Sequence, residues 1–130
     1  TKKPKLKTKT RYFNYFVFEH KNVYLYQKRI NKDIWQNLFE FYLVEEKNSK
    51  KALQLIKNKI QKKLPNPEKS NVITQLSHQK INVVFYNFNI DKKEDLNTIK
   101  ETLNLKKLKK SNIKKFGFPK VVDNYLNSHS

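Results

Sequence analysis

The sequence predicts a single domain of the mixed α/β (α+β) class, in which a mixed β-sheet is flanked by helices. Its 130 residues are enough for one hydrophobic core and too few for two. Hydrophobic residues make up only 37% of the chain, but aromatic residues reach 13%, and each buried ring removes a large apolar area from water. Strand-like runs precede and follow an amphipathic helix, and the single glycine excludes the glycine-rich phosphate loops of Rossmann and P-loop folds.

Residues 1–10, TKKPKLKTKT, are basic, contain a proline and show no apolar periodicity. These features are typical of a linker, so we expect residues 1–10 to form a basic interdomain linker and residues 11–128 to form the domain. The chain contains no methionine, which indicates a fragment of a longer protein.

The first two strands are expected at residues 12–19 and 23–29, joined by a short polar turn. Both faces of the first strand are apolar, which indicates a central strand that is covered on each side. One face carries Phe13, Tyr15 and Val17, and the other carries Tyr12, Phe16 and Phe18.

A loop and a short strand are expected over residues 33–46, DIWQNLFEFYLVEE, followed by an amphipathic helix that Asn48 or Ser49 can cap. The apolar residues of this helix recur at spacings of three, four and four, and the PNP segment at residues 65–67 ends it. They are Leu53, Ile56, Ile60 and Leu64.

Two apolar runs at residues 72–76 and 81–88 then flank the polar segment of residues 77–80, SHQK, which predicts a β-hairpin. Residues 89–104 are polar and indicate a long loop with one helical turn. The last segment predicts a short helix, a break at Gly117 and a final helix that begins near Pro119. The apolar face of the final helix carries Val121, Val122, Tyr125 and Leu126.

The chain has 29 Lys and Arg against 11 Asp and Glu, a formal net charge of +18. Such an excess attracts polyanions and favours a nucleic-acid partner, although it is also typical of lysine- and asparagine-rich proteomes. Only TKKPKLKTKTR and NLKKLKKSNIKK are dense enough to form basic patches.

The absence of cysteine excludes disulfides, thiolate zinc sites, iron–sulfur clusters and a cysteine nucleophile within this chain. No apolar run approaches the roughly 20 residues of a membrane span, and no signal-peptide pattern opens the chain. We therefore expect a soluble intracellular protein with no membrane partner.

Several motifs occur in an order that resembles the C-terminal domain of MutY-type adenine DNA glycosylases, whose fold is similar to that of Nudix hydrolases. An aromatic strand, a basic strand ending YQKR, a tryptophan segment, a helix, TQLSHQKINVVFY and FGFPKVVDNYL follow one another over most of residues 11–127. The family pattern around the tryptophan is roughly G-x-W-x-G-L-W-E-F-P. It is matched by Trp35, Leu38, Phe39, Glu40 and Phe41, whereas Asn37 and Tyr42 replace the glycine and the proline.

The resemblance implies that this domain recognises 8-oxoguanine opposite adenine in double-stranded DNA, as part of base excision repair. In that family a separate N-terminal domain of the same polypeptide extrudes and cleaves the adenine, and that domain carries the catalytic carboxylates and the iron–sulfur cluster. We therefore expect this chain to bind DNA as a monomer, without catalysis and without a cofactor, in the nucleoid of a bacterial cytoplasm.

The family's Phe-Ser-His loop corresponds to Leu76, Ser77 and His78, so Ser77 is the candidate reader of the lesion. A hydroxyl can accept a hydrogen bond from the proton that oxidation places on N7 of guanine. His78 would orient the loop or contact a phosphate, Leu76 would press on the base or the underside of the loop, and Gln79 and Lys80 would contact the backbone. The alternative for all five is an ordinary tight turn, where such residues are common.

Two other functions are weighed against lesion reading: a general basic nucleic-acid-binding module, including one for RNA, and a degenerate Nudix-fold interaction domain. A Nudix hydrolase is disfavoured, because the signature G-x5-E-x7-R-E-U-x-E-E-x-G-U agrees with the helix only at Glu46 and Ile56. Its helical glutamates fall on Leu55, Asn58 and Lys59. The three histidines lack metal-ligand spacing, and the aromatic stripes favour core over base-stacking platforms.

Overall fold

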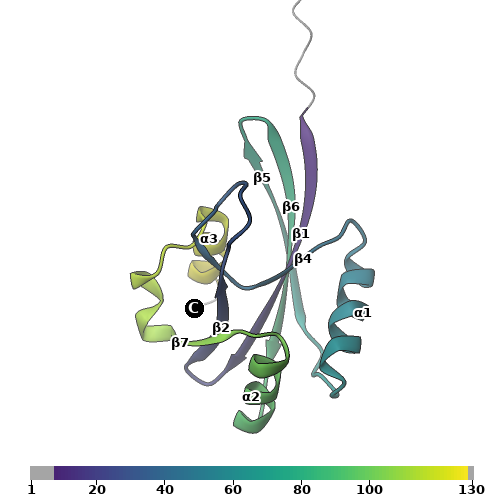
Figure 1. Cartoon of the computed structure of the whole chain (residues 1–130), viewed down its shortest axis with the longest axis vertical. Helices are drawn as coiled ribbons and strands as arrows, with labels where there is room; N and C mark the ends of the chain where they lie inside the picture. Colours follow the sequence, from purple (N-terminus) through teal and green to yellow (C-terminus); the bar gives the residue numbers. More distant parts are fainter. Residues whose placement is uncertain (1–7, 129–130) are drawn as a thin grey trace, which may run out of the picture.

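The computed structural model describes residues 8–128, which form one mixed sheet with helices on both sides (Figure 1). The prediction of a mixed α+β domain is therefore confirmed. The strands are β1 (Lys9–His20), β2 (Val23–Lys28), β3 (Phe39–Glu40), β4 (Tyr42–Glu45), β5 (Glu68–Leu76), β6 (Gln79–Asn89) and β7 (Lys106–Lys109). The helices are α1 (Ser49–Ile60), α2 (Lys93–Thr102) and α3 (Lys120–Ser128), with a 3-10 helix, η1 (Lys110–Lys115), before α3.

The sheet has seven strands in the order β3-β2-β1-β6-β5, with β4 paired to β1 and β7 paired to β2. Strand β1 is central, as predicted, and runs parallel to β6 from the pair Lys9↔Gln79 to the pair Glu19↔Asn89. On its other side β1 pairs with β4 and, at its end, with β2. The predicted hairpin is confirmed, because β5 and β6 are antiparallel from Glu68↔Asn87 to Leu76↔Gln79.

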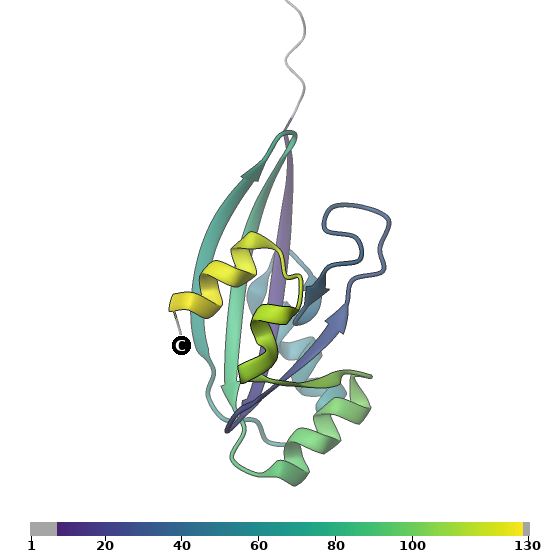
Figure 2. The same cartoon turned by 90° about the vertical axis from the view of Figure 1, so that its left-hand side faces the viewer.

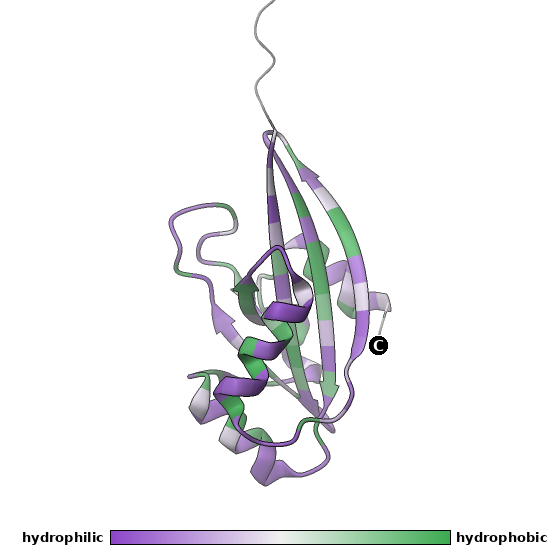
Figure 3. Cartoon of the chain, turned by 90° about the vertical axis from the view of Figure 1, so that its right-hand side faces the viewer, coloured by the Kyte–Doolittle hydropathy of each residue, from purple (hydrophilic) through white to green (hydrophobic). Residues whose placement is uncertain are grey.

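The side chains on the two faces of β1 pack into two different hydrophobic clusters, as the sequence pattern predicts. Phe13, Tyr15 and Val17 lie in the cluster beneath α3, whereas Phe16 and Phe18 lie in the cluster beneath α1 and α2. Figure 3 shows hydrophobic stretches interspersed with hydrophilic stretches along β5 and β6.

Helix α1 begins where its cap was expected and ends earlier. The side chain of Asn48 accepts hydrogen bonds from the backbone nitrogens of Lys50 and Lys51 at 3.0 and 3.2 Å. The left-handed conformation of Gln61, with φ of 53°, terminates the helix before the PNP segment. The expectation that the helix extends to Leu64 is therefore wrong, although that side chain still packs against the core.

Three further boundaries differ from the sequence-based expectations. The polar segment expected as a loop forms helix α2, because Leu96 and Ile99 bury one face of it. A strand, β7, precedes η1 in the lysine-rich segment where only a short helix was expected, and its Leu108 is buried against β2. Strand β1 already begins at Lys9, and residues 1–7 of the expected linker lie outside the described part of the chain. Among the described helices, none is long and apolar enough to cross a bilayer.

Candidate functional site

The tip of the β5–β6 hairpin is a two-residue turn, Ser77-His78, at one end of the molecule (Figure 2). Neither turn residue has a positive φ, so the turn is not one of the primed types that best match strand twist. Both side chains are exposed. Within residues 8–128 the hydroxyl of Ser77 has no hydrogen-bond partner, which leaves it available to a ligand.

The backbone on either side of this turn is held in place. The nitrogen of Lys9 donates to the carbonyl of His78 at 3.1 Å, which joins the tip to the start of β1. Gln75 Nε2 donates to the carbonyls of Leu76 and Gln79 at 3.0 and 3.2 Å across the hairpin. The tip therefore presents Ser77 on a fixed backbone.

The five candidate residues fall into two groups. Ser77, His78 and Lys80 are exposed and lie within four consecutive residues. Leu76 is half-buried and packs against the core cluster beneath α3, so it supports the underside of the turn. Gln79 is half-buried as well, and its side-chain oxygen accepts a hydrogen bond from Arg11 at 3.3 Å.

Arg11 is the centre of a polar network next to the hairpin tip. Its Nη2 donates to Asp33 at 2.8 Å and to Glu45 at 2.9 Å, and its Nε donates to Glu45 at 2.7 Å. The guanidinium also lies over the ring of Phe13, 4.9 Å from its centroid. Three segments that are distant in sequence, β1, β4 and the loop after β2, are thereby fixed to one another.

A second arginine continues this network inward. Arg29 Nη2 donates to both oxygens of Asp33 at 2.8 Å, and its Nη1 contacts Glu40 at 3.4 Å. Glu40 also accepts hydrogen bonds from Gln27 at 2.9 Å and from the hydroxyl of Tyr15 at 3.2 Å. Arg29 and Glu40 are almost fully buried, so their charges are stabilised by each other and by these bonds.

Burial and pairing shift the pKa values of Asp33 and Glu40 in opposite directions. Burial alone would raise the pKa of Asp33, but the hydrogen bonds from Arg11 and Arg29 outweigh it and lower that pKa below its ordinary value. Burial raises the pKa of Glu40 above its ordinary value, and the charge of Arg29 offsets only part of that effect. Burial likewise raises the pKa of the Tyr15 hydroxyl well above its usual range.

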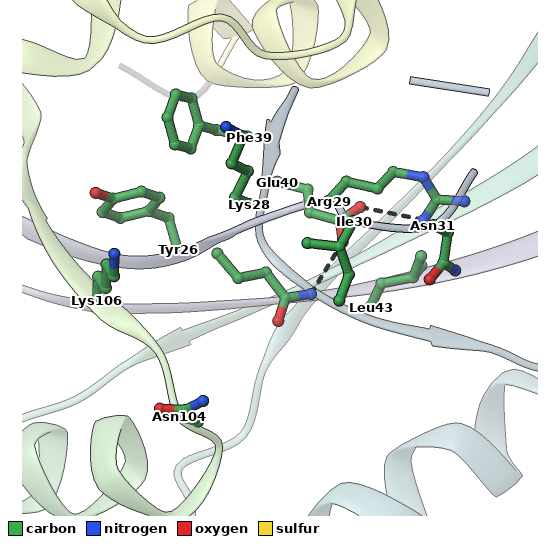
Figure 4. Close-up of a pocket in the computed structure, with 11 residues that line it drawn as sticks. Tyr26, Lys28, Arg29, Ile30, Asn31, Phe39, Glu40, Leu43, Asn104 and Lys106 are labelled. Atoms are coloured by element: carbon green, nitrogen blue, oxygen red, sulfur yellow. Dashed lines mark hydrogen bonds and ion pairs between the residues drawn. The ribbon is translucent and has the colours of Figure 1, made fainter. Parts of the chain in front are cut away.

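A pocket of about 690 Å³ opens beside Arg29 and Glu40 (Figure 4). Figure 4 shows Tyr26, Phe39 and Lys106 at one side of it and Ile30 and Asn31 at the other. These walls combine aromatic rings with cationic and amide groups. They can receive a polar or anionic group, but they offer no serine, cysteine or histidine as a nucleophile or base.

The sequence did not mark the residues of this network as site residues, although Glu40 matches the family pattern around the tryptophan. One signal was present, because Arg11 falls in phase with Phe13 and Tyr15 on an inward face, and a buried arginine requires a carboxylate partner. The carboxylate partners of Arg11, Asp33 and Glu45, lie 22 and 34 residues away in sequence, however, and no local sequence pattern identifies them.

A model of the NUDIX domain family matches residues 14–128 of the chain. The chain belongs to the NUDIX domain family. The match confirms the Nudix-like fold that the resemblance implies, and it spans every helix described above. No curated protein matches the chain.

Helix α1 of this NUDIX domain does not fit the metal chemistry of Nudix hydrolases. The positions of their helical glutamates are occupied by Leu55, Asn58 and Lys59, and Lys59 donates to the hydroxyl of Tyr42 at 3.1 Å. Mg²⁺ in such a site is held by carboxylate oxygens, and α1 contains no Asp or Glu. Across residues 8–128 no group of three or more His, Cys, Asp or Glu side chains is placed to hold a metal ion.

Proposed function

We propose that this NUDIX domain is the lesion-recognition domain of a MutY-type adenine DNA glycosylase, and that it binds 8-oxoguanine opposite adenine in duplex DNA. The observation that carries the proposal is the exposed hydroxyl of Ser77, which has no partner within the described residues and stands on a fixed two-residue turn. The net charge of +18 supports a polyanionic ligand.

The chemistry of the lesion suits a hydroxyl at this place. In guanine N7 is an acceptor, whereas in 8-oxoguanine N7 carries a proton and C8 carries a new carbonyl oxygen. Ser77 Oγ accepts from the N7 proton, and a backbone N–H of the turn donates to the new oxygen. Guanine would leave that donor facing a C–H and would force the hydroxyl of Ser77 to rotate from acceptor to donor, a mismatch that typically costs about 1–3 kcal/mol.

The neighbouring residues have supporting parts in this proposal. His78 and Lys80, both exposed, contact phosphates beside the lesion. Leu76 stabilises the turn from below, where it packs on the core. Adenine excision belongs to a separate N-terminal domain of the same polypeptide, and the domain described here acts with it as a monomer on one duplex.

One observation favours a second candidate, a general polyanion-binding module. Strand β7 and helix η1 carry six lysines, of which only Lys110 forms an ion pair within the described chain, with Glu19 at 2.7 Å. The others are Lys106, Lys107, Lys109, Lys114 and Lys115, and all are exposed. Such a strip binds phosphates without regard to base identity.

The replacement Ser77→Ala separates the two candidates. In the full-length protein, lesion reading predicts that Ser77→Ala lowers the preference for an 8-oxoguanine:adenine duplex over a guanine:adenine duplex by about 5-fold or more, the equivalent of about 1 kcal/mol, while the backbone N–H that alanine retains keeps part of the preference. Ser111→Ala, an exposed serine on η1, is the matched control. An equal loss of affinity on both duplexes would instead support the general module.

A further inference from the structure

The loop between β2 and β3 comprises residues 30–37. Its base is closed by hydrogen bonds from Arg29 N to Leu38 O at 2.8 Å and from Asn37 N to Arg29 O at 2.9 Å. Trp35 and Asn37 adopt φ values of 62° and 70°, and a positive φ is rare for a residue as bulky as tryptophan. Such strained backbone persists only where the surroundings fix it, and it is often found at functional sites.

Side-chain contacts supply that fixation. Trp35 packs edge-on against Phe13 with ring centroids 5.6 Å apart. Arg29 Nε donates to the carbonyl of Ile34 at 2.9 Å, inside the loop. Two arginines bind Asp33, as described above, so the only carboxylate of the loop is neutralised.

The outer surface of the loop offers groups that suit a nucleic acid. Lys32 and three amide side chains can donate hydrogen bonds to phosphate oxygens or base edges. Ile30 is 79% exposed and can cover sugars or the face of a base step. The exposed amides belong to Asn31, Gln36 and Asn37.

The loop and the hairpin tip are attached to the same guanidinium. Arg11 donates through Nη2 to Asp33 of the loop and through Nη1 to Gln79 of the hairpin, at 2.8 and 3.3 Å. Figure 2 shows the loop rising beside β1, on the side opposite to β5 and β6, towards the end that carries the hairpin tip. The rigid fork of an arginine fixes the direction of each bond as well as its length.

We propose that residues 30–37 form a second DNA-contacting segment, and that Arg11 is the positioning residue that holds this segment in register with Ser77. The choice of DNA as the partner rests on the function proposed above. In this arrangement Ser77 reads the lesion, while Lys32 and the loop amides bind the backbone beside it and Ile30 packs against the adjoining nucleotide.

The first test follows backbone amide signals of the 130-residue chain by NMR during titration with an 8-oxoguanine:adenine duplex. We expect shifts in residues 30–37 and in residues 76–80, and none in α1. Shifts confined to 76–80 would overturn the second segment and leave the proposed function intact. Shifts confined to 30–37 would retain the loop as an interface and remove the reading role of Ser77, and shifts in neither would contradict both.

A pair of charge reversals tests the loop contact itself. Lys32→Glu should weaken duplex binding and lower the salt dependence of log K by about one unit of slope, as expected for one lost phosphate contact. Lys57→Glu, at an exposed lysine of α1, makes the same change of charge away from the loop and should leave the slope unchanged. Equal effects of the two variants would mean that only net charge matters, which would contradict the proposal.

Arg11→Lys tests the positioning role. Lysine keeps the positive charge but cannot bind Asp33, Glu45 and Gln79 together. We expect the α1 signals to stay unchanged while the loop loses its duplex-induced shifts and the tip retains them. Should this variant fail to fold, Asp33→Ala removes the loop end of the link and is measured in the same way. Loop shifts that persist in a folded variant would exclude a positioning role.

Discussion

Arg29 and Glu40 lie 3.4 Å apart at 2% and 5% side-chain exposure, beside an open pocket. This pair joins β2 to β3 at the point where the loop of residues 30–37 leaves the sheet. Burial of the Glu40 carboxylate raises its pKa by more than Arg29 and the hydrogen bonds lower it. The pKa of Glu40 therefore lies above the ordinary value.

Glu40→Gln should therefore change the pH dependence of folding. A raised native pKa means that the native state holds this proton more tightly than the unfolded chain, so the wild type loses stability as the pH rises from about 4.5, the ordinary value, through the native pKa. Glutamine does not ionise, so the Glu40→Gln variant does not lose stability in this way as the pH rises. We expect the difference in free energy of unfolding, variant minus wild type, to grow with pH over that window, as measured by urea unfolding. A difference independent of pH would contradict the raised pKa.

Asp33→Asn should show the opposite trend. The pKa of Asp33 is lowered in the native state, so its contribution is complete above the ordinary value of about 3.8 and is lost as the pH falls through the native pKa. We expect the variant to be less stable by about 1–3 kcal/mol at neutral pH, because the hydrogen bonds from Arg11 and Arg29 lose their charged acceptor. The difference should shrink as the pH falls below about 4. A difference in free energy of unfolding that did not change with pH would show that the charge of Asp33 does not contribute to stability.

Two neighbouring leucine-sized residues on α1 test how this helix faces the sheet. Ile56 is fully buried, whereas Leu55 is 48% exposed. Ile56→Ala should lower the free energy of unfolding by about 2–5 kcal/mol through lost burial and a cavity. Leu55→Ala should cost less than about 1 kcal/mol. Equal costs would mean that the helix is rotated from the position described.

The absence of carboxylates on α1 predicts that this chain does not hydrolyse nucleoside triphosphates, including oxidised ones. We expect no release of pyrophosphate or phosphate in the presence of Mg²⁺, with a magnesium-dependent Nudix pyrophosphatase assayed in parallel. Glu46 is the one glutamate that agrees with the Nudix signature. Turnover that required Mg²⁺ and disappeared in Glu46→Gln would contradict this prediction.

Much of the fold follows from local patterns in the sequence. The central position of β1 is visible because Phe13 and Tyr15 alternate with Phe16 and Phe18, so both faces of one strand are apolar. The hairpin is visible because two β-branched runs flank four polar residues. In both cases the side chains that decide the structure are neighbours in sequence.

The remainder depends on contacts between distant segments. Helix α2 is stabilised by Leu96 and Ile99 against the sheet, two residues in a polar stretch whose local composition favours a loop. In strand β7 the single apolar residue, Leu108, is surrounded by lysines. The segment forms a strand because it pairs with β2 and buries Leu108 there. The network around Arg11 is of the same kind. The position of Ser77 on a turn was predictable, but the attachment of that turn to the loop of residues 30–37 was not.

The Ser77 contact is tested most directly with a lesion analogue that lacks the N7 proton. In 8-methoxyguanine the oxygen at C8 remains, but N7 is an unprotonated acceptor, so the Ser77 hydroxyl has no proton to accept and must rotate to donate instead. Opposite adenine, the wild-type protein should bind 8-oxoguanine more tightly than 8-methoxyguanine, and Ser77→Ala should reduce this ratio by about 5-fold or more. A Ser77→Ala protein that kept the wild-type ratio would contradict the account.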